Sequence, residues 1–209
     1  MSLVKQLSSQ AGDRTEQSNL RVAEQCLIEP RFIGEIVESL TQKDAALVGD
    51  CAEVLTMIAA EAPNLVAPHA QALVVLLGHK NTRVRWEAMH ALALTATLIP
   101  EVLVPLLPRL EETILNDTSV IVRDYAVDAA GNVALTNVSA ARTAYPILVH
   151  SLSAWEGKHA SHALNGLRHV ASVEPDLREE IAAIGIRYQG HERPVIRKAA
   201  KALLGDLKP

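Results

Sequence analysis

The sequence contains three histidines close together, at positions 159, 162 and 169, which are candidate metal ligands. His159 and His162 are three residues apart, so on a helix they share a face and can in principle contact one ion. His169 lies seven residues beyond His162, about 10 Å along a helix axis, which is too far for the same ion. Because a metal site needs further ligands in fixed geometry, we expect polar helix surface here and no metal.

Two carboxylates, Asp124 and Asp128, lie four residues apart in the stretch SVIVRDYAVDAAG at 119–131. On a helix they share a face, as a pair acting in general acid–base catalysis would. Tyr125 and Asn132 are their neighbours on that helix. An outward polar face with local ion pairing explains the same residues, and we expect no catalytic residue there.

The two cysteines, Cys26 and Cys51, lie in apolar helical patterns with no histidine nearby. They are too few for a disulfide framework, which favours a reducing compartment. The first 17 residues have no apolar core of a signal peptide, and the apolar runs are too short to span a bilayer. We therefore predict a cytoplasmic location, no membrane contact and no bound cofactor.

The composition favours helices. Of the 209 residues, 49% are hydrophobic but only 3% are aromatic. Small and straight-chain apolar residues suit closely packed helices, whereas strand-rich domains carry more aromatic residues. The formal net charge of −4 gives no general attraction to nucleic acid or to an anionic membrane.

One pattern, Val/Ile-Arg-x-x-Ala, recurs along the chain. It occurs at Arg85, Arg123 and Arg197, and the following alanines are Ala88, Ala126 and Ala200. The first two arginines are 38 residues apart and the last two are 74 apart, which is twice 37. Degenerate copies in phase, at Gly49 and Ala160, fill the remaining positions. Such a fixed period indicates a stack of similar units.

Each copy is followed by a second amphipathic stretch, with apolar residues at helical spacing. Asp44, Asn81, Thr118 and Ser139 stand where helix N-caps belong, and prolines stand at the breaks. The unit is therefore a helical hairpin of about 37 residues, repeated about five times and closed by one helix over 193–207. The second stretches cover residues 31–40, 68–78, 101–115, 140–155 and 178–190.

The repeated Val-Arg-x-x-Ala-x-x-Ala pattern resembles the HEAT repeats over about residues 18–207. The resemblance implies an all-α, right-handed superhelical solenoid, with first helices on the convex side and second helices on the concave side. It also implies that Arg85, Arg123 and Arg197 belong to a ladder against carboxylates or carbonyls of adjacent repeats. Gly49 and Ala160 depart from the pattern, so this ladder is interrupted. Ala88 and Ala126 would lie in the seam between helices.

Some proteins with HEAT-like folds are enzymes, and two resemblances bear on this. The pair His191-Glu192 is similar to the His-Glu pairs of iron-binding HEAT-repeat hydroxylases, but here only one pair occurs. Alkylpurine DNA glycosylases of this fold use aromatic, acidic and arginine residues in a basic concave cleft, whereas these second helices have mixed charge. An accessory or lyase-type factor acting on a cofactor-bearing protein is a further alternative.

The second helices carry side chains that a core does not need. We predict a non-catalytic protein-binding or scaffold module, with a protein or peptide partner rather than nucleic acid. Trp86 can be a binding anchor or a packing residue. The residues predicted to contact the partner are Arg109, Glu112, Arg142, His150 and Arg187.

The two ends of the chain complete the prediction. Residues 1–15 are expected to be a flexible tail, and residues 16–209 a single domain. The last helix has no following repeat to cover its apolar residues, so it can pair with a second copy unless Arg197, Lys198 and Lys201 give it a polar outer face.

Overall fold

The computed structural model describes residues 2–207, and within them it contains helices and turns but no strand. The chain divides into two compact units at the Leu98–Ile99 junction. A single domain over 16–209 was predicted, and residues 208–209 of that range lie outside the described part. Because each hairpin of a repeat protein packs only on its neighbours, no single core has to run the length of the chain.

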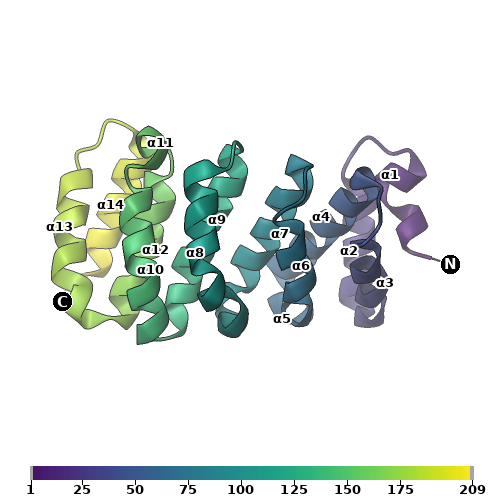
Figure 1. Ribbon diagram of the computed structural model, residues 1–209, viewed down its shortest axis with the longest axis horizontal. Coiled ribbons are helices and arrows are strands. Elements are labelled where there is room, and N and C mark those ends of the chain that lie inside the picture. The colour runs from purple at the N-terminus through teal and green to yellow at the C-terminus, as the bar shows by residue number, and fades with distance from the viewer. Residues whose placement is uncertain (1, 208–209) are drawn as a thin grey trace. The chain divides into compact units, whose positions relative to one another are not determined.

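The first unit contains three long first helices and shorter second helices (Figure 1). Helix α4 packs between α2 and α7, while α3 packs on α4 and α6 packs on α7. The apolar faces of α4 and α7 are fully buried, including Ala88 at the predicted seam. In chain order the elements are η1 (Val4–Gln6), α1 (Ser8–Ala11), α2 (Gln17–Ile28), η2 (Pro30–Phe32), α3 (Ile33–Ser39), α4 (Ala45–Glu61), α5 (Pro63–Val66), η3 (Ala67–His69), α6 (Ala70–Leu76), α7 (Thr82–Thr95) and η4 (Ala96–Leu98).

Residues 1–15 were predicted to be a flexible tail; Met1 lies outside the described part, and residues 2–15 contain helical turns that pack on the first unit. Leu3 and Leu7 are buried, and the short helices η1 and α1 pack on α2, α3 and α4. The backbone N–H of Ser9 donates to Asp50 on α4 at 2.7 Å. Leu3 and Leu7 flank the turn η1, and burying both side chains holds the segment in place.

The second unit repeats the same arrangement. Helix α12 packs between α9 and α14, and the second helices α8, α10 and α13 pack against α9, α12 and α14, respectively. Figure 1 shows α10 and α12 side by side with α13 and α14. Ala126, at the predicted seam, is fully buried. The elements are α8 (Pro100–Asn116), α9 (Val120–Val133), η5 (Ala134–Thr136), α10 (Val138–Ser151), α11 (Ala154–Gly157), α12 (Ala160–Val173), η6 (Pro175–Leu177), α13 (Arg178–Tyr188) and α14 (Pro194–Asp206).

The closest helix contact of the second unit joins two glycines. A Cβ atom added to Gly131 on α9 would lie 2.6 Å from the Cα of Gly166 on α12. A Cβ on Gly166 would lie 2.6 Å from a methyl carbon of Leu148. No side chain fits between these backbones, so the two glycines set the distance between α9 and α12.

Four N-caps were predicted, and two of them are confirmed. The side chains of Asp44 and Asn81 accept hydrogen bonds from backbone N–H groups in the first turns of α4 and α7. For α9 and α10 the caps are Ser119 and Asn137, one residue after and two residues before the predicted positions. All four residue types are good caps, so type alone does not choose between neighbouring candidates.

Candidate functional site

The five predicted partner-contacting residues lie on the second helices of the second unit, and all are exposed. Within residues 2–207, the side chains of Arg109 and Glu112 on α8 make no hydrogen bond or ion pair. Neither residue is therefore required to hold its helix in place. His150, on the adjacent α10, and Arg187, on α13, extend this exposed set. We call Arg109, Glu112, Arg142, His150 and Arg187 the second-helix row.

One member of the row ties two second helices together. The Nδ1 atom of His150 lies 2.8 Å from Oε1 of Glu111, which links α10 to α8. His150 is mostly exposed and Glu111 is one-third exposed. Such a surface pair contributes little to stability but fixes the direction of both side chains.

Arg142 is engaged within its own unit. Its Nε donates to Glu174, and its Nη2 donates to Asp176 at 3.0 Å. The hydrogen bond from Arg142 keeps the pKa of Glu174 below its usual range. The Glu174 side chain is 3% exposed, so Arg142 anchors the start of η6 as well as facing solvent.

Prolines inside the second helices add hydrogen-bond acceptors to the same face. Pro105 and Pro108 lie within α8 and Pro146 lies within α10, and all three are exposed. Proline has no N–H, so the carbonyls of Glu101 and Arg142, four residues before Pro105 and Pro146, lose their usual helical donors. A bound partner can donate to such carbonyls.

The repeated arginines share one local contact. The Nη1 atom of Arg85 donates to the carbonyl of His79 at 3.0 Å, and Arg197 donates to that of His191 at 2.7 Å. Arg123 donates to the carbonyl of Asp117 in the same way. In each case the acceptor lies six residues earlier, in the turn before the first helix. The arginines thus close the turns between successive hairpins.

Arg123 also forms the centre of a buried network in the second unit. It is 2% exposed, and its Nε donates to Nε2 of His159 at 3.0 Å. Since Nε2 accepts, the proton of a neutral His159 lies on Nδ1, which donates to Asp124 at 2.6 Å. The guanidinium carbon lies 3.8 Å from the ring centre of Trp155, a cation–π contact.

Trp155 closes this network from a strained turn. Its φ is 50° and that of Glu156 is 59°, a left-handed conformation that side chains rarely adopt. The indole N–H donates to the carbonyl of Ile114 at 3.0 Å. Trp155 therefore covers Arg123 and plugs the end of α8, while 41% of its own surface is exposed.

The other two histidines of the cluster have different surroundings. The Nδ1 atom of His162 lies 2.8 Å from Asp128, and this hydrogen bond raises the pKa of His162. Burial lowers the pKa of His169, which contacts the carbonyl of Gly131. The prediction of polar surface is wrong for His159, which is fully buried. Among residues 2–207 no three histidine, cysteine or acidic side chains meet as metal ligands would.

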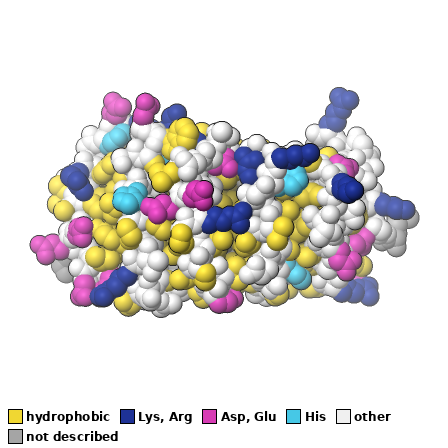
Figure 2. Space-filling model, viewed as in Figure 1, with side chains coloured by type: hydrophobic (Ala, Val, Ile, Leu, Met, Phe, Trp, Pro, Cys, Tyr) yellow, Lys and Arg dark blue, Asp and Glu magenta, His cyan; other side chains and the backbone are white. Residues whose placement is uncertain are grey.

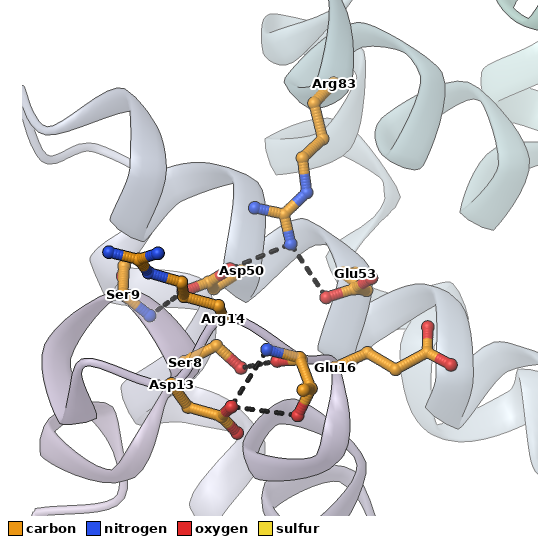
Figure 3. Close-up of a pocket in the computed structure, with 9 residues that line it drawn as sticks. Ser8, Ser9, Asp13, Arg14, Glu16, Asp50, Glu53 and Arg83 are labelled. Atoms are coloured by element: carbon orange, nitrogen blue, oxygen red, sulfur yellow. Dashed lines mark hydrogen bonds and ion pairs between the residues drawn. The ribbon is translucent and has the colours of Figure 1, made fainter.

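The first unit contains a polar cavity of about 380 Å³ beside α4 (Figure 3). Arg83 of α7 reaches toward two carboxylates of α4, with Nη2 at 2.8 Å from both Asp50 and Glu53. Asn19 of α2 donates to the same two carboxylates. Burial raises the pKa of Asp50, but hydrogen bonds from Ser9, Asn19 and Arg83 outweigh it and leave that pKa low.

Trp86 and Glu87 form a second polar contact on α7. The Trp86 indole N–H donates to Oε1 of Glu87 at 2.6 Å, and Thr56 on α4 donates to the Glu87 carbonyl. Glu87 is 9% exposed, and burial raises its pKa. Trp86 is half-buried.

Sequence reasoning missed the networks around Asp50 and Glu87. The available signal was a charged residue inside an apolar first helix: Asp50 lies in the stretch 45–52, whose other residues are apolar or glycine. A buried charge must be paired, which predicts a partner without naming it. The partners are 30 or more residues away, on α2 and α7.

Comparison with known proteins identifies the fold. No family model and no curated protein match the sequence. A designed armadillo repeat protein is 20% identical over 99% of this chain and 98% of its own, with a TM-score of 0.74. A second one, solved in complex with the peptide (KR)4, is 21% identical over the same shares, also with 0.74. An engineered protein of the Northeast Structural Genomics Consortium is 21% identical over 98% and 94%, with 0.73.

The chain is thus an all-α solenoid of the HEAT and armadillo type, as the repeat pattern predicted. No helix within residues 2–207 combines the length and apolar character that crossing a membrane requires.

Proposed function

We propose that this protein is a binding module whose second-helix row receives a protein or peptide partner. The observation that carries the proposal is the exposed set on α8, α10 and α13, which includes charged residues that the fold itself does not use. The freed carbonyls beside Pro105 and Pro146 add backbone acceptors for an extended chain. The similarity in fold to a designed armadillo repeat protein in complex with a peptide supports the same use.

The charge pattern favours protein over nucleic acid as the partner. Acidic Glu101, Glu112 and Glu179 stand among the arginines of these helices. On the face shown in Figure 2, basic and acidic side chains alternate with apolar ones instead of forming one basic track. A phosphate backbone requires the opposite arrangement, with cations gathered along its path.

The proposal is tested by placing a photo-crosslinking amino acid at position 109 or 187 and identifying captured proteins by mass spectrometry. Binding of each captured protein is then measured with Arg109→Ala/Arg187→Ala. We expect weaker binding and an unchanged melting temperature, since neither side chain pairs within the unit. Lys198→Ala, at an exposed residue of α14, is the matched control. An equal loss of binding in Lys198→Ala would contradict the proposal that the second-helix row contacts the partner.

Arg142 is unsuitable for this test. Removing it would leave the nearly buried carboxylate of Glu174 without its charged partner, so lost stability would mask lost binding. Measurements with labelled duplex DNA complete the test. We expect weak binding at about 150 mM salt, and tight, salt-sensitive binding that Arg109→Ala/Arg187→Ala abolishes would contradict the proposal.

Self-association through α14 is a separate part of the prediction. Ile196, Ala199 and Leu203 are buried within the unit, while Val195 is 53% exposed beside the exposed Lys198. A Val195→Lys variant removes the apolar contribution and leaves the buried face intact. Sedimentation of both forms at high concentration tests the pairing: a dimer that Val195→Lys dissociates supports it, and a monomer in both contradicts it.

A further inference from the structure

A second surface lies on the first helices of the first unit, whereas the second-helix row belongs to the second unit. A groove with a cavity of about 430 Å³ runs between α2 and α4. Its floor is apolar, and the carboxylates of Glu24 and Glu61 stand at its edges. The residues that line it are Leu20, Ala23, Glu24, Leu27, Met57, Ala60 and Glu61.

The groove is bordered by two matching stripes of side chains. Glu16, the N-cap residue of α2, is followed at four-residue spacing by Leu20 and Glu24 on the helix. Along α4, Glu53, Met57 and Glu61 follow one another at the same spacing. Four residues of helix rise by about 6 Å, so each wall presents an acid, an apolar side chain and an acid at this interval.

The charge around the groove is unbalanced. The residues that line the groove include two carboxylates, Glu24 and Glu61, and no lysine or arginine, while the polar cavity formed by α1, the segment before α2, α4 and α7 is lined by four carboxylates and two guanidiniums. Arg83 is already paired with Asp50 and Glu53. No ion pair within residues 2–207 involves Glu24 or Glu61, so their negative charge faces solvent above an apolar floor.

The apolar part of the groove is open. Leu20 is 38% exposed. Met57 is half-buried in the opposite wall. A methionine side chain adapts to the shape of what it contacts, which suits a surface that receives a partner.

We propose that the groove between α2 and α4 binds a basic amphipathic segment of a partner protein. Apolar side chains of that segment would cover Leu20, Leu27 and Met57, and its lysine or arginine side chains would pair with Glu24 and Glu61. This surface is independent of the second-helix row, since its residues belong to the first unit.

The test uses a short fluorescein-labelled amphipathic peptide of leucine and lysine as the probe, and fluorescence anisotropy to measure its affinity for the full chain. We expect Glu24→Gln/Glu61→Gln to weaken binding roughly tenfold, which corresponds to about 1.4 kcal/mol. Leu20→Ser/Met57→Ser should weaken it by a similar factor, because the apolar floor is lost. Circular dichroism verifies that each variant is folded.

Matched controls separate docking from general attraction between opposite charges. Glu179→Gln/Glu180→Gln removes two exposed carboxylates from α13 in the second unit and should change the affinity less than about twofold. Hydrogen exchange should slow in α2 and α4 when the peptide is bound. The corresponding peptide of leucine and glutamate should not bind.

Three results would overturn the proposal. One is equal weakening by Glu179→Gln/Glu180→Gln and by Glu24→Gln/Glu61→Gln. Another is equal binding of the glutamate peptide. The third is loss of binding in Arg109→Ala/Arg187→Ala with no effect of Leu20→Ser/Met57→Ser, which would place the peptide on the second-helix row instead.

Discussion

Both units bury charged side chains between their first helices, but they neutralise them differently. In the first unit, Arg83 bridges two carboxylates of the preceding helix beside an open cavity. In the second unit, Arg123 donates to a neutral acceptor, His159, and Trp155 covers it. An arginine of a first helix can therefore be held by an ion pair that is half open to water or by a closed hydrogen-bonded network.

The difference follows from what each repeat offers. Arg83 lies two residues before the repeated position Arg85, so it points to α4, where Gly49 leaves room: a Cβ there would lie 3.3 Å from the Arg83 guanidinium. Arg123 is at the repeated position and reaches α12, where a glycine pair brings the backbones together. Small residues in the two units thus serve different purposes, room for a side chain in one and contact between backbones in the other.

The largest expected effect on stability comes from alanine substitutions at Gly131 and Gly49, which test this difference between the two units. Gly131→Ala would force the backbones of α9 and α12 apart and should destabilise the protein by about 1–3 kcal/mol. Gly49→Ala meets only the end of a flexible side chain, so a gain in helix propensity of up to about 1 kcal/mol can offset the contact. Urea denaturation followed by circular dichroism measures both. Gly205→Ala, in a helix with open space around it, is the control.

Substituting Arg123 and Arg83 in turn compares how much the closed network and the open ion pair contribute to stability. Arg123→Met leaves Nε2 of the buried His159 without its donor and should cost roughly 1–3 kcal/mol. Arg83→Met should cost about 1 kcal/mol, because the Arg83 side chain is 35% exposed and water screens its charge. Thermal melts of the two variants give the order of their stability losses. A larger loss of stability in Arg83→Met than in Arg123→Met would contradict the prediction.

The stability of the second unit should depend on pH near neutrality. Hydrogen bonding to Asp128 raises the pKa of His162, so this pair stabilises the fold below the unfolded-state pKa of histidine and the contribution is lost as pH rises through the folded value. Asp128→Asn should therefore lower the melting temperature more at pH of about 5.5 than at about 8. His162 is one-third exposed, so we expect less than about 1 kcal/mol.

The pKa of His169 is shifted in the opposite direction to that of His162, so a variant at His169 is the control for that experiment. Burial lowers its pKa, so its contribution to stability is present when it is neutral and is lost as pH falls. A His169→Gln variant should be less sensitive to acid than the parent. If Asp128→Asn and His169→Gln shift the pH dependence in the same direction, the assigned surroundings of these histidines are wrong.

The smallest expected effect is a change in the rate of cysteine labelling. This rate reports on opening of the first unit alone. Cys26 and Cys51 both lie in the first unit, and burial raises the pKa of their thiols to about 11 and about 12. Reaction with a thiol reagent at neutral pH should be slow until that unit opens. Arg83→Met should accelerate labelling, whereas Arg123→Met should change it less. Fast labelling of the intact protein would show that the thiols are accessible.

Several features of the fold could be predicted from the sequence because they depend on local periodicity. The positions of the first helices and the caps at Asp44 and Asn81 follow from residue types and spacing. The exposure of the second-helix row follows in the same way, since a helix with one apolar face must turn the other to solvent. The burial of Leu3 and Leu7 was missed because two leucines are a weak signal.

What the tertiary structure decided is which distant side chains meet. Nothing in the sequence pairs Arg123 with His159 or Asp50 with Asn19, because those contacts join different helices and depend on their packing distance and rotation. The groove between α2 and α4 likewise exists only once the two helices lie side by side. The sequence itself determined the helices, their period and their apolar faces, since these depend on neighbours three or four residues away. The partner of each buried charge was decided by contacts between repeats, over 30 residues away, for which local patterns carry no information.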